Sequence, residues 1–176
     1  MNRVIVIGNS GSGKSTLGRE VASRLGVQFI EADSIFHQPN WTELPAEEFR
    51  ATMDNLTNTD SWVLDGNYQR FLLDITWPKA DTVIWLDYHQ SIVLWRVIRR
   101  TLGRLVNKKT TLWNGNRETW RMTFSKQSII IWSLNMHYTY RRRYEKLLRL
   151  PETGHLQVVH LKSPREARAW IAALTS

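Results

Sequence analysis

The sequence predicts an α/β fold: a parallel sheet with helices on both faces. Two observations predict it. Short apolar runs recur at residues 4–7, 27–30, 62–64, 82–86 and 156–161, and the segments between them are long enough for helices. Uninterrupted apolar runs are typical of strands buried on both faces, and parallel strands need crossover connections of helical length. The second observation is a glycine-rich loop directly after the first run.

The first βα unit has the clearest boundaries. Residues 4–7 form a β-branched run that ends at Gly8, and residues 14–25 place Leu17, Val21 and Leu25 at helical spacing before Gly26. Glycine directly after a periodic segment is a helix stop signal. The chain is therefore expected to open with a buried strand, a glycine-rich turn and an amphipathic helix.

Four further helices are predicted. The segment 45–56 begins with Pro45 in its first turn and has acidic residues near the positive end of the helix. A basic amphipathic pattern covers 90–105, and 118–148 reads as one long helix or two. Ser163 followed by Pro164 predicts a capped helix over 164–174.

Length and composition limit the possible classes of protein. The 176 residues are expected to form a single domain, 1–176, and the absence of cysteine excludes disulfides, thiolate zinc sites and a cysteine nucleophile. No run approaches the roughly 20 apolar residues that span a bilayer, and the start does not read as a signal peptide. We expect a cytoplasmic protein with no membrane partner.

The net charge of +8 is unevenly distributed along the chain. Residues 1–88 hold 7 basic and 12 acidic residues, whereas residues 89–149 hold 14 basic and 2 acidic ones. A mildly acidic body thus carries one strongly positive segment, which favours an anionic partner such as a nucleotide or a nucleic acid.

Residues 8–15, GNSGSGKS, match the pattern G-x-x-x-x-G-K-[ST] in full. With a strand before it and a helix after it, such a loop surrounds a phosphate chain with backbone N–H groups. Lys14 would reach the β- and γ-phosphates, and the Ser15 hydroxyl would bind Mg²⁺. A glycine turn that binds nothing is the disfavoured alternative. The nucleotide-binding residues predicted here are Gly8, Asn9, Ser10, Gly11, Ser12, Gly13, Lys14, Ser15 and Thr16.

A carboxylate at the end of a nearby strand usually assists a phosphate-bound Mg²⁺. Asp65 and Asp87 both follow predicted strands. Asp65 is preferred because Gly66 permits a tight turn beside a ligand, whereas Asp87 precedes a helix and is explained by capping. Ser15 and Asp65 are therefore the predicted metal residues.

The basic segment is interpreted as a lid. Arginines at 96, 100 and 104 repeat every four residues on one helix face, residues 105–117 are polar enough for a loop, and Arg117 and Arg121 follow. Guanidinium groups from a mobile lid can stabilise a transferred phosphoryl group. For any single arginine a solvated helix face is the alternative.

Three features together resemble the adenylate-kinase-like group of P-loop nucleotide kinases: residues 8–16, Asp65-Gly66 at the third strand, and the pair Arg96 and Arg100. Asp33 with Trp41, the run 65–68 and the run 114–118 look like the related bacterial group labelled topology modulation proteins. The resemblance implies a P-loop NTPase, three-layer fold of the NMP-kinase type with strand order 2-3-1-4-5, MgATP on the loop and an arginine-rich helical lid. It also implies that Arg96 stacks on adenine and Arg100 meets phosphates.

The sequence departs from that group where the acceptor binds. Where adenylate kinases carry D-G-F-P-R, this chain reads DGNYQ, with Arg70 one place late. An ionised monophosphate needs cations, whereas an alcohol benefits from a carboxylate that takes its proton. Asp33, at the carboxyl end of the second strand, suits the alcohol, although a loop or capping role is its alternative. The predicted substrate-binding residues are Asp33, Trp41, Asn67, Tyr68 and Arg70.

These predictions combine into an ATP-dependent kinase that transfers the γ-phosphoryl group of MgATP to a small acceptor, either monophosphate-like or an alcohol. An acceptor segment would cover about 31–76 and the basic lid about 96–149. Two alternatives stay open: a nucleotide-dependent nucleic-acid-binding protein, less favoured because its basic residues lie where a lid is expected, and an ATP sensor without turnover. Arg141, Arg142 and Arg143 are not explained by the kinase hypothesis. The predicted catalytic residues are Lys14, Asp33, Arg100, Arg117 and Arg121.

Overall fold

The computed structural model describes residues 1–106, 111–117 and 129–174 of the chain. Its centre is a five-stranded parallel sheet in the order β2-β3-β1-β4-β5, as the sequence predicted. The strands are β1 (Arg3–Gly8), β2 (Gln28–Glu31), β3 (Trp62–Asp65), β4 (Thr82–Leu86) and β5 (Gln157–Leu161). Because β1 lies between β3 and β4, the loop after β1 emerges at the middle of the sheet's carboxyl edge, where open α/β folds bind ligands.

The connections are mostly helical, with short 3-10 turns beside them. The helices are α1 (Lys14–Leu25), α2 (Ala32–Phe36), α3 (Ala46–Leu56), α4 (Gln69–Thr76), α5 (Gln90–Val106), α7 (Ile129–Leu147) and α8 (Pro164–Ala173). The 3-10 turns are η1 (Pro39–Trp41), η2 (Trp113–Gly115) and η3 (Pro151–Thr153). The helices α1, α3, α5 and α8 were predicted to within one or two residues, but α2 and α4 were not predicted at all.

The predicted helix starts compare with the structure as follows: one is corrected, one is confirmed, and one lies outside the described residues. Pro45 occupies the position before the first helical residue of α3, not its first turn, since the helix begins at Ala46. The helix predicted over 118–148 is described only from Ile129, because its first eleven residues lie outside the described part. The cap at Ser163 is confirmed: its hydroxyl accepts a hydrogen bond from the Glu166 N–H, and Pro164 follows in the first turn.

Side chains alternate across the sheet and form two cores, so the three-layer prediction is confirmed. On one face Ile5 and Ile7 pack with Met53 of α3 and Tyr144 of α7. On the other face Val4 and Val6 pack with side chains of α1 and α8, including Val21 and Ile171. Uninterrupted apolar strands are required by this double coverage.

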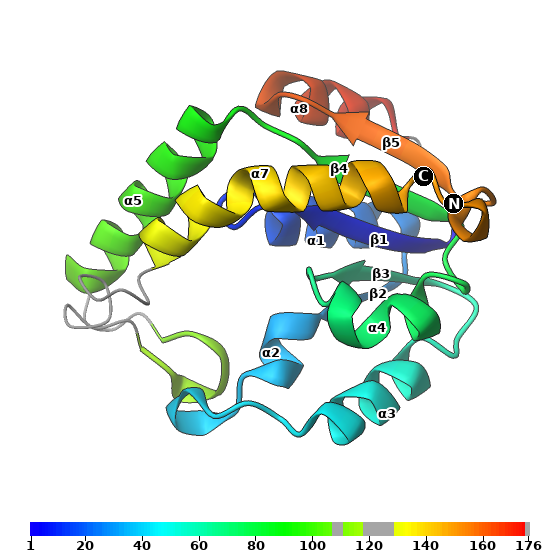
Figure 1. The fold of residues 1–176 in the computed structure, drawn as a ribbon, viewed down its shortest axis with the longest axis horizontal. Helices are drawn as coiled ribbons and strands as arrows, with labels where there is room; N and C mark the ends of the chain where they lie inside the picture. The colour runs from blue at the N-terminus through cyan, green and yellow to red at the C-terminus, as the bar shows by residue number, and fades with distance from the viewer. Residues whose placement is uncertain (107–110, 118–128, 175–176) are drawn as a thin grey trace.

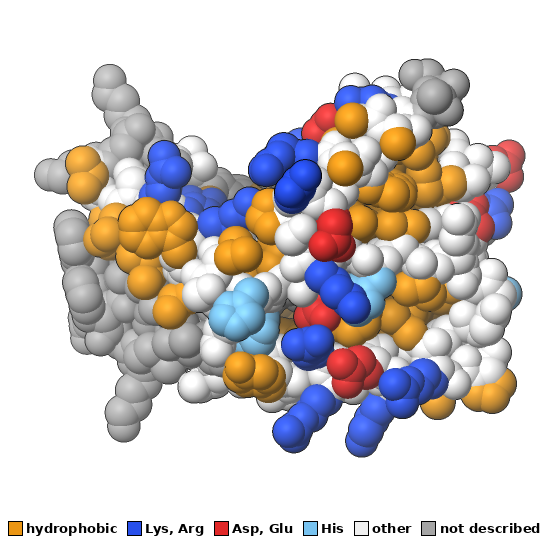
Figure 2. All heavy atoms as spheres, turned by 90° about the horizontal axis from the view of Figure 1, so that it is seen from above, with side chains coloured by type: hydrophobic (Ala, Val, Ile, Leu, Met, Phe, Trp, Pro, Cys, Tyr) orange, Lys and Arg blue, Asp and Glu red, His pale blue; other side chains and the backbone are white. Residues whose placement is uncertain are grey.

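The helices α5 and α7 pack against each other and extend beyond the sheet (Figure 1). At the same end of the sheet, α2 and η1 follow the strand β2 and lie across from α5 and α7 (Figure 1). Seen from above, the molecule is hollowed, with Lys and Arg side chains on both sides of the hollow (Figure 2). None of the helices within the described ranges is long and apolar enough to cross a membrane.

Candidate active site

A cleft of about 1480 Å³ opens at the carboxyl edge of the sheet, and the glycine-rich loop forms one of its walls. It brings together most of the residues that the sequence singled out, from the loop, α2, η1, the segment after β3, and α5. The predicted residues that line it are Ser10, Gly11, Ser12, Gly13, Lys14, Ser15, Thr16, Asp33, Trp41, Asn67, Tyr68, Arg96 and Arg100.

The loop has the backbone conformation of a phosphate cradle. Gly11 and Gly13 have φ of 87° and 97°, a left-handed region that favours glycine. A Cβ on Gly11 would lie 2.5 Å from Cγ2 of Val97 and 2.9 Å from the Val93 carbonyl oxygen, so the loop also packs tightly against α5. The helix α1 begins at Lys14 and directs its free N–H groups into the cleft.

Asp65 and Ser15 meet beside the loop as predicted. The parallel register pairs Val6 with Asp65, which places the carboxylate next to the end of β1. The Ser15 hydroxyl donates a hydrogen bond to Oδ2 of Asp65, while Oδ1 is buried without a partner among the described residues. Burial raises the pKa of Asp65, and Lys14 and the Ser15 hydroxyl oppose that shift. A buried hydroxyl–carboxylate pair with one unsatisfied oxygen fits a hydrated divalent cation.

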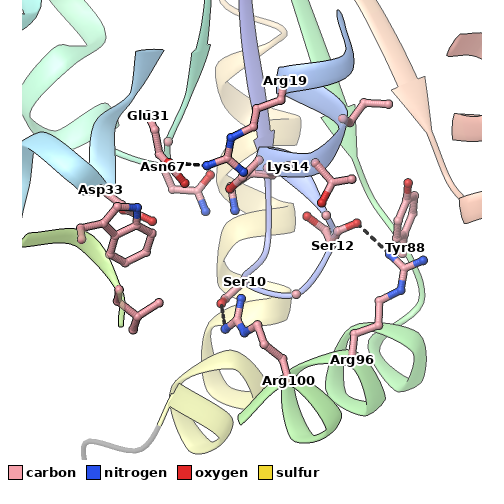
Figure 3. Close-up of a pocket in the computed structure, with 18 of the residues that line it drawn as sticks. Ser10, Ser12, Lys14, Arg19, Glu31, Asp33, Asn67, Tyr88, Arg96 and Arg100 are labelled. Atoms are coloured by element: carbon pink, nitrogen blue, oxygen red, sulfur yellow. Dashed lines mark hydrogen bonds and ion pairs between the residues drawn. The ribbon is translucent and has the colours of Figure 1, made fainter. Parts of the chain in front are cut away.

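Two arginines of α5 donate hydrogen bonds to the glycine-rich loop. Nη1 of Arg96 donates to the Ser12 carbonyl oxygen at 3.0 Å, and its guanidinium lies over the Tyr88 ring. Nη2 of Arg100 donates to Oγ of Ser10 at 3.2 Å. Figure 3 shows Arg96 and Tyr88 on one side of Lys14, and Glu31 and Asp33 on the other. The cleft therefore has a phosphate end and an opposite end.

That opposite end contains the predicted acceptor carboxylate. The Tyr68 hydroxyl donates to Oδ1 of Asp33 at 2.6 Å. Burial raises the Tyr68 pKa well above its ordinary value, and the negative charge of Asp33 raises it further, so the phenol stays protonated as a donor. Glu31, two residues before Asp33 at the end of β2, is engaged by Arg19 at 2.6 Å. Asp33 is therefore oriented by a neutral donor rather than by a cation.

Four predicted residues lie elsewhere than expected. Arg70 is exposed outside the cleft, its guanidinium 4.4 Å from the centre of the Phe71 ring. Asn9 faces away from the cleft and donates to the Ser133 carbonyl oxygen at 2.9 Å. Gly8 is bound by the Asn67 side chain and Arg117 is exposed; neither lines the cleft. Arg121 lies outside the described residues, so the lid segment 96–149 is described only in part.

Asn67 supports the loop as well as lining the cleft. Its Nδ2 donates to the Gly8 carbonyl oxygen at 2.6 Å, and its Oδ1 accepts from the Tyr144 hydroxyl at 2.8 Å. The latter contact connects α7 to the strand that precedes the loop. No local pattern indicates this role, because the Asn67–Tyr144 contact joins residues far apart in the chain.

The capping role for Asp87 is wrong. Its carboxylate accepts a hydrogen bond from Nε2 of His160 at 3.0 Å and lies 3.4 Å from Nε of Arg141, while α5 begins three residues later. Arg141 also pairs with Glu145, and Arg143 lies over the Tyr140 ring. Part of the unexplained basic charge thus stabilises the packing of α7, which weakens the nucleic-acid alternative.

An asparagine latch joins the segment 111–117 to the segment 34–41 across the cleft. Nδ2 of Asn114 donates to the carbonyl oxygens of Ser34 (3.1 Å) and His37 (2.6 Å). Asn116 donates to the Gln38 carbonyl oxygen and accepts from the Trp41 N–H, both at 2.9 Å. Sequence reasoning missed the latch; its local signal was the turn-forming run Asn-Gly-Asn.

Replacing Asn116 by alanine should open the latch without unfolding the protein. The loss of two partly buried hydrogen bonds weakens the contact by about 1–3 kcal/mol, so we expect the Trp41 backbone amide to exchange with solvent deuterium roughly tenfold faster or more. Hydrogen exchange read by mass spectrometry checks this. Asn58→Ala, in an exposed turn, is the matched control, and equal exchange in both variants would rule the latch out.

His137 makes the loop support sensitive to acid. Its Nδ1 lies 3.4 Å from Nδ2 of Asn9, and burial holds the pKa of His137 below its ordinary value of 6.5. A lowered histidine pKa gives stability that is complete above pH 6.5 and is lost as the pH falls through the folded-state value. We expect the urea midpoint to fall from pH 7.5 to 5.5, and to fall less in His137→Asn. The exposed His155→Asn variant should match wild type. An equal fall of the urea midpoint between pH 7.5 and 5.5 in all three proteins would contradict the expectation.

Comparisons with known proteins find similarity to small-molecule kinases. The shikimate kinase family model matches residues 10–51. Shikimate kinase of Synechococcus sp. (strain CC9902) is 31% identical over 104 residues, covering 55% of this chain and 52% of its own length, and that of Halorhodospira halophila is 34% identical over 74 residues, covering 36% and 42%. The chain therefore spans about half the length, or less, of these curated relatives.

Two solved structures match nearly the whole chain. A shikimate kinase from Acinetobacter baumannii in complex with shikimate has a TM-score of 0.61 at 15% identity, covering 98% of this chain and 89% of its own. A gluconokinase from Sinorhizobium meliloti 1021 has a TM-score of 0.52 at 21% identity, covering 97% and 91%. These matches do not test the predicted likeness to topology modulation proteins. They show that the chain has the P-loop kinase fold found in shikimate kinase and gluconokinase.

Proposed function

We propose that the protein is an ATP-dependent kinase that transfers the γ-phosphoryl group of MgATP to a hydroxyl group of a small acceptor. One observation carries the proposal: the phosphate loop and the Asp33 carboxylate line the same cleft, and the neutral Tyr68 hydroxyl orients that carboxylate. The likeness to an adenylate-kinase-related group belongs to the same proposal, with an alcohol in place of a monophosphate as acceptor.

The chain's own residues would do the following work. The loop N–H groups and Lys14 hold the phosphates, and Arg96 and Arg100 fix the loop from behind. Ser15 and Asp65 would hold Mg²⁺, which neutralises charge on the β- and γ-phosphates. The acceptor oxygen bonds to the γ-phosphorus while the bond to the β–γ bridging oxygen breaks. Asp33 takes the hydroxyl proton, and ADP leaves with the bridging oxygen.

The test is acceptor-dependent ADP release measured over a panel of hydroxyl compounds and nucleoside monophosphates. We expect at least one alcohol to raise ADP release well above the rate in water alone. If ATP binds tightly and no acceptor raises ADP release, the protein is a nucleotide sensor and the kinase proposal fails. Binding of duplex or single-stranded DNA at low salt, with no turnover, would instead support the nucleic-acid alternative.

A further inference from the structure

We propose that the acceptor is an alcohol that carries no acid group, neither carboxylate nor phosphate. The inference rests on the proposed kinase function and concerns the end of the cleft opposite the phosphates. We define this acceptor end by six residues that line the cleft: Asp33, His37, Trp41, Glu43, Tyr68 and Trp113. Two of them are carboxylates, three are neutral aromatic rings and one is a histidine.

The carboxylates of the acceptor end are not neutralised by the described part of the chain. No ion pair among the described residues involves Asp33 or Glu43, and the group bound to Asp33 is the uncharged Tyr68 hydroxyl. The pKa of Tyr68 is raised first by burial and then by Asp33, Glu43 and Asp65, so negative charges surround this ring. An acid group placed here would be repelled, whereas hydroxyl or ammonium groups would donate hydrogen bonds.

The arginines of the acceptor segment 31–76 are engaged outside the cleft. The segment 31–76 contains nine acidic residues and only two basic ones, Arg50 and Arg70. Arg50 binds both carboxylate oxygens of Asp74, at 2.9 and 2.7 Å, and Arg70 lies over the Phe71 ring. Neither arginine lines the cleft.

The other cations that line the cleft are Lys14, Arg19, Arg96, Arg100, Arg104 and Arg168, of which Arg104 lies on α5 and Arg168 on α8. Arg96 and Arg100 donate to the loop residues Ser12 and Ser10, and Arg19 is paired with Glu31. Figure 3 shows Arg96 on the opposite side of Lys14 from Asp33, and Arg100 beside Ser10. Negative charge on a bound molecule is therefore accommodated at the phosphate end, where the triphosphate would lie.

Aromatic rings give the acceptor end its second property. The His37 ring is stacked with Trp113, their centres 5.9 Å apart at 22°, and meets Trp41 edge-on at 5.6 Å. The latch fixes this arrangement, because Asn114 binds the His37 carbonyl oxygen and Asn116 binds the Trp41 N–H. Aromatic faces beside carboxylates suit the C–H face of a sugar-like ring or an ammonium group.

The test compares acceptors of similar size that differ in one substituent and hence in charge: glucosamine, glucose and glucuronate, and matched amino, neutral and acid derivatives of the other alcohols in the panel. We expect kcat/KM to be at least tenfold higher for the best neutral or amino acceptor than for its acid partner. The variant Glu43→Lys should narrow that ratio roughly tenfold at low ionic strength. Glu47→Lys makes the same charge change at an exposed site outside the cleft and should leave the ratio unchanged.

The outcomes separate this inference from the kinase proposal. If acids are the best acceptors, and Lys14→Ala abolishes their turnover, the kinase proposal stands and the acceptor inference is overturned. The acceptor inference is also overturned, and the kinase proposal stands, if Glu43→Lys and Glu47→Lys give the same ratio of kcat/KM between the neutral or amino acceptor and its acid partner. If no acceptor of any charge raises ADP release, both proposals fail together.

Discussion

Replacing Lys14 by alanine should lower acceptor-dependent ADP release by roughly 10²–10³-fold, because it removes a cation aimed at the charge that develops on the transferred group. Lys14 is the first residue of α1, and its Nζ reaches back to within 3.4 Å of the Asn9 carbonyl oxygen across the loop. The ammonium thus lies in the centre of the cradle rather than at its edge.

Initial rates measured by coupled detection of ADP check this expectation. Lys146→Ala, an exposed lysine near the end of α7, is the matched control and should keep the wild-type rate. A thermal unfolding midpoint close to that of wild type would show that Lys14→Ala is folded. Equal ADP release by wild type and Lys14→Ala with every acceptor would remove the loop from the reaction.

The second large effect is expected for Asp33→Asn, with kcat lowered roughly 10²–10⁴-fold, the range for loss of a general base. Asparagine keeps the size of the side chain and can still accept the hydrogen bond from Tyr68, but it cannot take the acceptor's proton. The KM for ATP should change little, because the phosphates are held at the other end of the cleft. Steady-state kinetics with ATP and the acceptor varied in turn measures kcat and the KM for ATP separately.

Two further variants make the result specific. Tyr68→Phe removes the donor but leaves the carboxylate, and should lower kcat less than Asp33→Asn does. Asp60→Asn changes an exposed aspartate paired only at the surface with Arg3 and should have no effect. A capping or loop role for Asp33 predicts the opposite pattern: a lower unfolding midpoint with kcat unchanged.

Elements with local signals were predicted accurately. The helix at Lys14–Leu25 and the strand at Thr82–Leu86 match the predicted limits, because glycines and buried β-branched runs mark their ends. The helix α2, by contrast, has five residues and no side-chain cap, so nothing nearby announces it. Its existence depends on the packing of Phe36 into the core, which a local pattern does not contain.

The part of the site that one continuous segment builds could be predicted from the sequence. The contacts that bring several segments together could not. The loop is a continuous motif, and Asp65 follows it through the parallel register of two strands. The contacts of Asp87 could not be predicted without the position of β5. The register pairs Trp85 with His160 and so brings the histidine beside the Asp87 carboxylate. Arg70 was misplaced because contact with Phe71, and not distance along the chain, decides where its guanidinium lies.

The asparagine latch also bears on how the reaction would be timed. Its hydrogen bonds join neutral amide groups to backbone atoms on opposite sides of the cleft. A phosphorylated product held beneath it would leave once these bonds break, and such flap opening is a motion of microseconds to milliseconds. Product departure, not bond making, would then limit turnover, and a more viscous solvent would slow the enzyme.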